Sequence, residues 1–228
     1  MAEQRRKAMI IGASRGIGLG LTREFAERGW RVVGSERARS AALHDLAARF
    51  GGQVGIVEVD VTDRDSIAEL ASSQPRGSLD VLLVNAGIYD ARSVDGASDD
   101  DILRIMLANA AGPVRAARAL LPALCDGAIL AFTTSLMGSV ADSSGGAELY
   151  RMSKAAQNIL ARGLFEQEAK GRGIAVLSLH PGWVRTDMGG GNAPVTVEDS
   201  ARGLADVLTA PQPLAHRFLD YTGRELPW

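Results

Sequence analysis

The sequence has almost no cysteine, no large excess of charge of either sign and no long apolar run. Its 228 residues include a single cysteine, Cys125, which excludes an internal disulfide and a metal site built from cysteines. Lysine and arginine number 25 against 27 aspartate and glutamate, a net charge of −2, which does not suit nucleic acid or an anionic membrane surface. No stretch reaches the roughly 18 uninterrupted apolar residues of a membrane span. We therefore expect a cytoplasmic protein without a metal, nucleic-acid or membrane partner.

Apolar residues are nonetheless abundant, at 46% of the chain, and they follow a regular pattern. Short, nearly continuous apolar runs, typical of strands covered on both faces, occupy residues 8–11, 30–34, 54–59, 81–84, 128–133 and 174–179. Stretches of helical period lie between them, at residues 16–28, 38–50, 63–72, 99–124 and 147–170. Strict alternation of strand and helix predicts right-handed crossovers. We predict an α/β fold, a single doubly wound Rossmann-type domain over residues 1–228, with a parallel sheet of about seven strands and helices on both faces.

A glycine-rich turn, Gly12-Ala13-Ser14-Arg15-Gly16-Ile17-Gly18, joins the first expected strand to the first helix. Glycines let backbone N–H groups approach a pyrophosphate closely, and the helix N-terminus adds partial positive charge. Glu36, at the end of the second expected strand, stands where an acidic residue accepts hydrogen bonds from an adenosine ribose. Three glycines also form ordinary turns, but the order strand, turn, helix favours a dinucleotide site.

Tyr150 and Lys154 lie four residues apart in the helical stretch 147–170, so both side chains lie on one helix face. A phenol with an ordinary pKa of about 10 is a poor acid or base at neutral pH. A lysine ammonium one turn away favours the phenolate and lowers that pKa toward the range useful for proton transfer. Taken alone, such a pair is typical of a solvated helix face.

The surroundings of this pair change its interpretation, because further motifs follow in a fixed order along the chain. After the glycine turn they are Asp60-Val61, Asn85-Ala86-Gly87, Asn109, Ser135, Tyr150-x-x-x-Lys154 and Pro181-Gly182-Trp183-Val184-Arg185-Thr186. Over its whole length the chain resembles the short-chain dehydrogenase/reductase family. Residues 189–193 and 217–228 further resemble the C-factor/sniffer-like carbonyl reductase branch of that family.

The resemblance implies an NAD(P)(H)-dependent oxidoreductase of the carbonyl reductase or alcohol dehydrogenase type, with no metal. Tyr150 would be the general acid toward a carbonyl oxygen in reduction and the general base in oxidation. Ser135 would donate a hydrogen bond to the same oxygen. Lys154 would lower the pKa of Tyr150 and bind the nicotinamide ribose, and Asn109 would hold a water that links Lys154 to solvent.

The family pattern also implies a set of cofactor-binding residues. They are Gly12, Ser14, Arg15, Gly16, Ile17, Gly18, Glu36, Arg37, Asp60, Val61, Asn85, Ala86, Gly87, Tyr150, Lys154, Pro181, Gly182, Val184 and Thr186. The choice of cofactor is divided within this set. Glu36 favours NAD(H), since a carboxylate repels a 2′-phosphate, whereas Arg15 and Arg37 favour NADP(H), since a guanidinium pairs with phosphate. We favour NADP(H) slightly.

Three functions fit a glycine turn of this kind. The first is a working oxidoreductase that acts on a small carbonyl or alcohol, and the second is a regulatory protein that binds the nucleotide as a signal with little turnover. A methyltransferase is a weaker third, because it has no use for Tyr150 and Lys154. Relatives pair through the helical stretches 99–124 and 147–170, so the resemblance implies a homodimer or homotetramer.

Overall fold

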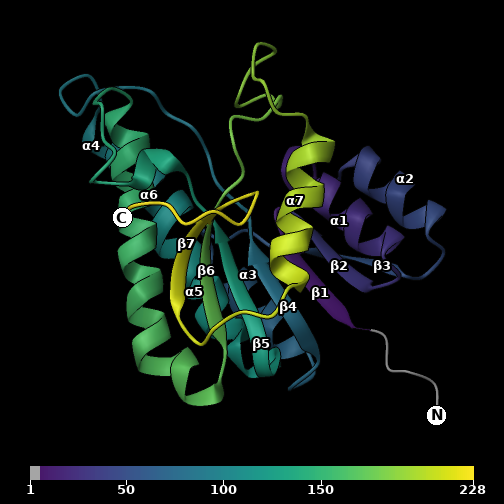
Figure 1. The fold of residues 1–228 in the computed structure, drawn as a ribbon. Helices are drawn as coiled ribbons and strands as arrows, with labels where there is room; N and C mark the ends of the chain where they lie inside the picture. Colours follow the sequence, from purple (N-terminus) through teal and green to yellow (C-terminus); the bar gives the residue numbers. More distant parts are fainter. Residues whose placement is uncertain (1–5) are drawn as a thin grey trace.

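The computed structural model describes residues 6–228, so the first five residues of the predicted domain lie outside it. A seven-stranded sheet forms the centre of this part of the chain, in the order β3-β2-β1-β4-β5-β6-β7 (Figure 1). All neighbouring strands are parallel. The strands are β1 (Lys7–Ile11), β2 (Arg31–Glu36), β3 (Val54–Glu58), β4 (Leu79–Val84), β5 (Leu124–Thr133), β6 (Ala175–His180) and β7 (His216–Asp220). The predicted doubly wound parallel sheet is thereby confirmed.

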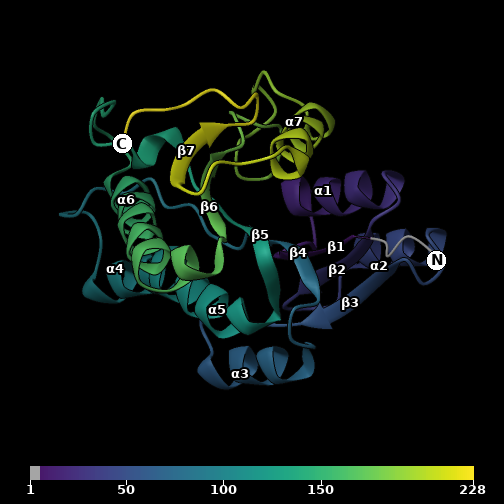
Figure 2. The same ribbon diagram turned by 60° about the horizontal axis from the view of Figure 1, so that its bottom comes forward.

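Helices cover both faces of the sheet (Figure 2). On one face lie α1 (Gly16–Glu27), α2 (Ala41–Arg49) and α7 (Val197–Thr209). On the other face lie α3 (Arg64–Ser73), α5 (Gly112–Leu120) and α6 (Glu148–Leu164). The remaining helical segments are α4 (Asp99–Met106), η1 (Leu107–Ala111), η2 (Leu121–Ala123), η3 (Leu136–Gly138), η4 (Phe165–Ala169) and η5 (Lys170–Arg172).

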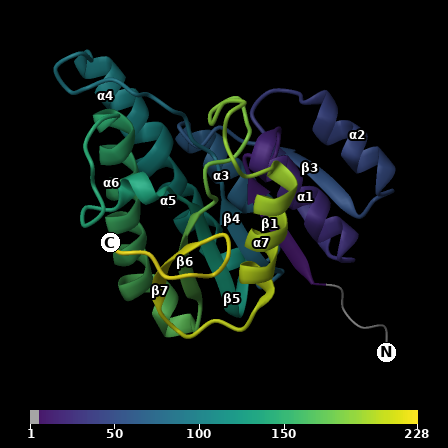
Figure 3. The same ribbon diagram turned by 45° about the horizontal axis from the view of Figure 1, so that its top comes forward.

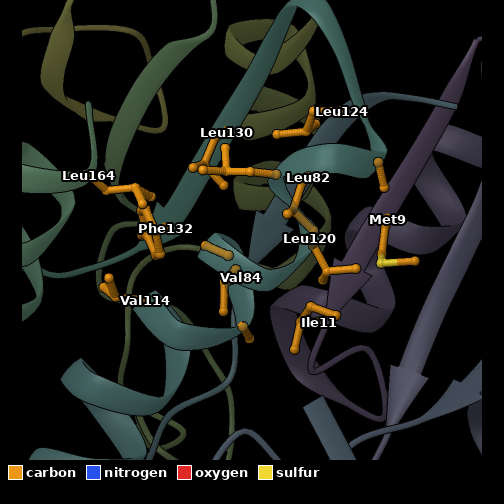
Figure 4. Close-up of a cluster of buried hydrophobic side chains, with 14 of the residues drawn as sticks. Met9, Ile11, Leu82, Val84, Val114, Leu120, Leu124, Leu130, Phe132 and Leu164 are labelled. Atoms are coloured by element: carbon orange, nitrogen blue, oxygen red, sulfur yellow. The ribbon is translucent and has the colours of Figure 1, made fainter. Parts of the chain in front are cut away.

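Both faces of the central strands are buried, which explains their nearly continuous apolar sequences. Successive side chains of β4 point to opposite faces, so Leu82 joins the cluster under α3, α5 and α6, and Leu83 joins the one under α1 and α7. Figure 4 shows the first cluster, in which Leu82 lies beside Leu130 of β5 and Leu120 of α5. The two apolar layers fix the sheet between its helices, and the strand ends are held in place with it.

The structure corrects the predicted elements in two places. The helical stretch predicted for residues 99–124 is interrupted by the π-helical η1 and ends at Ala123, because Leu124 begins β5 and pairs with Leu79 of β4. The sequence pattern indicates neither helix α7 nor strand β7. No helix in residues 6–228 has the length and apolar character needed to cross a membrane.

The order of the strands determines where a ligand can bind. Strand β1 lies between β2 and β4, so the chain leaves it toward one edge of the sheet and later returns on its other side. At such a switch point the connections diverge and leave a crevice at the carboxyl ends of the strands. The segment between β6 and α7 lies over these strand ends (Figure 3).

Candidate active site

A cavity of about 540 Å³ opens at the carboxyl ends of the strands and brings most of the predicted site together. The predicted residues that line it are Gly12, Ser14, Arg15, Gly16, Ile17, Arg37, Asp60, Val61, Asn85, Ala86, Gly87, Tyr150, Lys154, Pro181 and Thr186. The predicted residues outside its lining are Gly18, Glu36, Asn109, Ser135, Gly182 and Val184. The glycine turn and the Tyr150–Lys154 pair therefore share one cavity although they are far apart in the sequence.

The glycine turn packs against the end of β4. Gly12 has a φ of +87°, and a Cβ atom built on it would lie 2.8 Å from the backbone nitrogen of Ala86. The Asn85 amide nitrogen donates to the Gly12 carbonyl at 2.9 Å, and the Asn85 amide oxygen accepts from the Thr133 hydroxyl at 2.9 Å. A Cβ on Gly18 would overlap the Gly12 carbonyl. Gly18 is thus needed for packing within the turn, and Asn85 ties the turn to the end of β5.

The N-terminus of α1 faces this cavity through Arg15, Gly16 and Ile17. No side chain caps the helix, and its first turn contains no acidic residue. The first backbone N–H groups of a helix lack partners within the helix, and the helix dipole favours negative charge beside them. Gly16 adds a φ of +53° in the same turn. The free backbone N–H groups at the start of α1 are therefore suited to bind a phosphate group.

Glu36 is hydrogen-bonded to its own neighbours in the sequence. Its carboxylate accepts from the Ser40 backbone nitrogen at 2.7 Å and bonds the His44 ring at 2.9 Å, and Glu36 does not line the cavity. Burial acts to raise the pKa of Glu36, but these two bonds outweigh it and hold the pKa below its usual value. His44 and Ser40 use one acceptor position on each oxygen of the Glu36 carboxylate, and the contact of Glu36 with a ribose stays a prediction. Arg37, the next residue, does line the cavity, with its guanidinium 3.8 Å from Asp60.

Tyr150 lies in an apolar environment at the inner end of the cavity. Its ring packs edge-on against Tyr89, with 5.0 Å between centroids. Burial raises the pKa of Tyr150 to about 12, although a hydrogen bond with the Ser135 side chain acts in the opposite direction. Ser135 also accepts from the Met137 backbone nitrogen at 3.1 Å. At neutral pH the Tyr150 phenol therefore keeps its proton.

Lys154 is buried beside Tyr150, with its ammonium 5.9 Å from the Tyr150 ring centroid. Its Nζ donates to the Thr133 carbonyl at 2.8 Å and to the Gln157 amide oxygen at 3.3 Å. Burial lowers the pKa of Lys154 to about 7. The sequence spacing predicts that Lys154 lowers the pKa of Tyr150, but the net shift is upward because burial of the phenol dominates.

Asn109 lies in η1, behind the Tyr150–Lys154 pair, and is fully buried. Its amide oxygen accepts from the Ile88 backbone nitrogen at 2.7 Å. Its amide nitrogen donates to the Ile88 carbonyl at 2.8 Å and to the Ser153 hydroxyl at 3.0 Å. The side chain thus joins η1 to the segment after β4 and to α6, and it fixes the helix that carries Tyr150 against the strand ends.

The segment after β6 contributes residues that the sequence motifs missed. Arg185, Asp187 and Met188 line the cavity, and Asp187 forms an ion pair with Arg15 of the glycine turn. Their connection to the site depends on the path of this loop, and no local spacing signals it. Two predicted residues of the loop play a packing role: Gly182 has a φ of +86° beneath the ring of Tyr221, and Val184 is buried.

Comparison with known proteins agrees with this geometry. The family model for short chain dehydrogenase matches residues 6–194. C-signal of Myxococcus xanthus is 43% identical over 157 residues, which cover 67% of this chain and 94% of that protein. A carbonyl reductase from Pseudomonas aeruginosa PAO1, solved in complex with NADP, is 38% identical with a TM-score of 0.88, covering 99% of this chain and 100% of that one. Carbonyl reductase Sniffer of D. melanogaster is 28% identical with a TM-score of 0.89, covering 99% and 100%.

The chain belongs to the short-chain dehydrogenase family. Its relatives include C-signal and Sniffer, as the resemblance of residues 189–193 and 217–228 to the C-factor/sniffer-like branch predicts. The protein is an enzyme, an NAD(P)-dependent oxidoreductase.

Proposed function

We propose that the protein is an NADP(H)-dependent carbonyl reductase in which Tyr150 supplies the proton. The observation that carries this proposal is the shared cavity, which is lined by the glycine turn on one side and by Tyr150 and Lys154 on the other. The proposed substrate is a small carbonyl compound or the corresponding alcohol. A phenol that is protonated at neutral pH is suited to give a proton to the negative charge that develops on a carbonyl oxygen during reduction.

Each side chain has a distinct part in this reaction. The reduced cofactor, when bound, supplies the hydride that no side chain can provide. Tyr150 gives its hydroxyl proton to the carbonyl oxygen, so that the substrate gains one hydride and one proton and becomes an alcohol. Ser135 donates to the same oxygen and stabilises its negative charge. Lys154, charged below a pH of about 7, binds the nicotinamide ribose. Asn109, whose side-chain N–H groups are already bonded to Ile88 and Ser153, would contribute to the water link between Lys154 and solvent only through its remaining acceptor positions.

NADP(H) is the cofactor that the charges of the cavity favour. Arg15 and Arg37 line it, whereas the Glu36 carboxylate is bonded to His44 and Ser40 outside it. A guanidinium pairs with a phosphate through two parallel hydrogen bonds, and the Glu36 carboxylate, although it is charged, does not line the cavity. The remaining residues of the predicted set, from Gly12 to Thr186, would hold the cofactor along the strand ends. The Pseudomonas relative solved with NADP supports the same choice.

Replacing Arg37 by Ser tests this assignment. We expect the Kd of NADPH to rise about 10- to 100-fold, the value of a hydrogen bond to a charged group, while the Kd of NADH changes little. Arg39→Ser is the matched control, because Arg39 lies near His44 and not in the cavity. Fluorescence titration of both reduced cofactors measures the effect. Equal losses for NADPH and NADH would contradict a contact between Arg37 and the 2′-phosphate.

The activity itself is tested by following the absorbance of NADPH and NADH against small aldehydes, ketones, diketones and quinones. We expect oxidation of NADPH with at least one carbonyl class, and faster than that of NADH. Tight binding of both cofactors without turnover of any carbonyl would instead favour the regulatory alternative, in which the nucleotide is a signal.

We also propose that the chain forms one domain and assembles as a homodimer or homotetramer in the cytoplasm. Apolar side chains exposed on α4 and α6, at Leu103, Ile159 and Leu160, support pairing through these helices. The lone cysteine fits a reducing compartment. A monomer in light scattering at micromolar concentration would refute the assembly.

A further inference from the structure

The ammonium of Lys154 is held by neutral oxygens alone. Lys154 is 3% exposed, and its two acceptors are the carbonyl of Thr133, at 2.8 Å, and the amide oxygen of Gln157, at 3.3 Å. Burial is the sole cause of its low pKa. An ammonium has three N–H donors, so these two acceptors leave one donor for a ligand in the cavity that Lys154 lines.

Gln157 is an unusual residue for its place on α6. It lies one helical turn beyond Lys154 and is fully buried, and its amide nitrogen has no hydrogen-bond partner. A buried amide costs free energy unless it is hydrogen-bonded, so an apolar side chain would suit a purely structural position better. The one side-chain hydrogen bond that Gln157 forms in the described structure is the one from Lys154.

We propose that Gln157 is a positioning residue for Lys154, whose ammonium its amide oxygen holds in place beside the Thr133 carbonyl. This inference rests on the proposed function, which gives Lys154 its part in the active site. Gln157 touches neither substrate nor cofactor in this account and acts only through Lys154.

No charged neighbour provides an alternative anchor. The ring centroid of Tyr150, on the same helix, lies 5.9 Å from the ammonium. The segments η3 and η1, which pack against α6, carry no titratable group. The titratable groups elsewhere on α6 and on the other elements packed against it are Glu148, Arg151, Arg162, Asp99, Asp100, Asp101, Arg104, Arg115, Arg118, Glu166, Glu168 and His180. None of them is hydrogen-bonded to the Lys154 ammonium, whose partners in the described structure are Thr133 and Gln157.

Substitutions of Gln157 should therefore move the titration of Lys154 in opposite directions. An acceptor oxygen favours the ammonium over the neutral amine. Gln157→Leu removes that acceptor and should lower the pKa of Lys154 by about one pH unit, the value of one hydrogen bond to a charged group. Gln157→Glu places a carboxylate at the same point and should raise it.

The chain contains only three lysines, Lys7, Lys154 and Lys170, which makes a direct measurement practical. Protein labelled with ¹³C at lysine Cε gives three NMR signals, and Lys7→Arg and Lys170→Arg assign the signal of Lys154. The pH titration of that signal in the cofactor-free protein reports its pKa without any need for turnover. Gln157→Met serves as a second apolar variant if Gln157→Leu does not fold.

Asn158→Leu is the matched control. Asn158 is also a buried amide on α6, its side-chain atoms have no hydrogen-bond partner, and it does not bond Lys154. This variant should leave the Lys154 titration unchanged. We expect Gln157→Leu, but not Asn158→Leu, also to weaken NADPH binding and to shift the pH profile of kcat/KM in the same direction as the titration.

The two proposals fail in different ways. If the Lys154 signal titrates alike in the wild type, Gln157→Leu and Gln157→Glu, the positioning role of Gln157 is wrong. If the signal moves as expected but the wild-type protein reduces no carbonyl, Gln157 does hold Lys154 and the proposed function is wrong. Both proposals are supported if Gln157→Leu and Gln157→Glu shift the pKa of Lys154 in opposite directions and the pH profile of kcat/KM shifts with it.

Discussion

Tyr150→Phe is expected to lower kcat for carbonyl reduction by about 10²- to 10⁴-fold, the usual contribution of a positioned general acid. The substitution removes the hydroxyl proton and leaves the ring in its apolar place against Tyr89. Because the pKa of Tyr150 is raised to about 12, the wild-type phenol is fully protonated at neutral pH, so the whole population of the enzyme loses its acid. Steady-state oxidation of NADPH measures the loss.

Tyr89→Phe is the control for Tyr150→Phe, since it removes a phenolic hydroxyl from a ring in contact with Tyr150. We expect kcat of Tyr89→Phe to stay within a few-fold of the wild type. NADPH binding should survive in both variants, which separates lost chemistry from lost structure. Full activity of Tyr150→Phe would show that the proton comes from another group.

Gly12→Ala is expected to abolish NADPH binding and to destabilise the fold by about 2–5 kcal/mol, the sum of left-handed backbone strain and overpacking. At Gly12 the φ is +87°, and an added Cβ would lie 2.8 Å from the backbone nitrogen of Ala86. Because that neighbour is backbone, the turn itself must move, and the N–H groups that face the cavity must move with it. Chemical denaturation and NADPH titration measure the two effects.

Gly29→Ala separates strain from crowding. Gly29 has nearly the same φ, +82°, but a Cβ there would meet no atom within 4 Å. Gly29→Ala should lower the free energy of unfolding by only about 1–2 kcal/mol, which is the cost of the left-handed backbone alone. The affinity for NADPH should stay unchanged. If the two alanine variants lost equal stability and both bound NADPH normally, close packing of Gly12 against Ala86 would not be what forms the site.

Much of the fold could be predicted because its signals are local. The first six strands overlap apolar runs in the sequence, and the alternation with helices implies the parallel sheet. The sequence pattern does not indicate strand β7, because His-Arg-Phe-Leu-Asp carries polar or charged side chains at three of five positions. The helical stretch 99–124 was extended one residue too far, since only pairing with Leu79 of β4 shows that Leu124 is in a strand.

The site also contains residues that the sequence could predict and residues that it could not. Residues adjacent in sequence, such as the glycine turn and the Tyr150–Lys154 pair, could be predicted from spacing. The orientation of Glu36 could not, because it is set by His44 on the following helix. The pKa of Tyr150 is raised, against the prediction, because burial outweighs the hydrogen bond with Ser135. Gln157 gave no signal, since its importance depends on its bond with Lys154.

The most direct test of the account is to follow the hydrogen itself. NADPH deuterated on the transferable position of the nicotinamide is mixed with the wild-type protein and a reactive carbonyl, and the product is analysed by mass spectrometry. We predict an alcohol that carries one deuterium on the former carbonyl carbon, formed by the wild type and almost absent with Tyr150→Phe. NADPH binding without any deuterated alcohol, across the whole carbonyl panel, would contradict it.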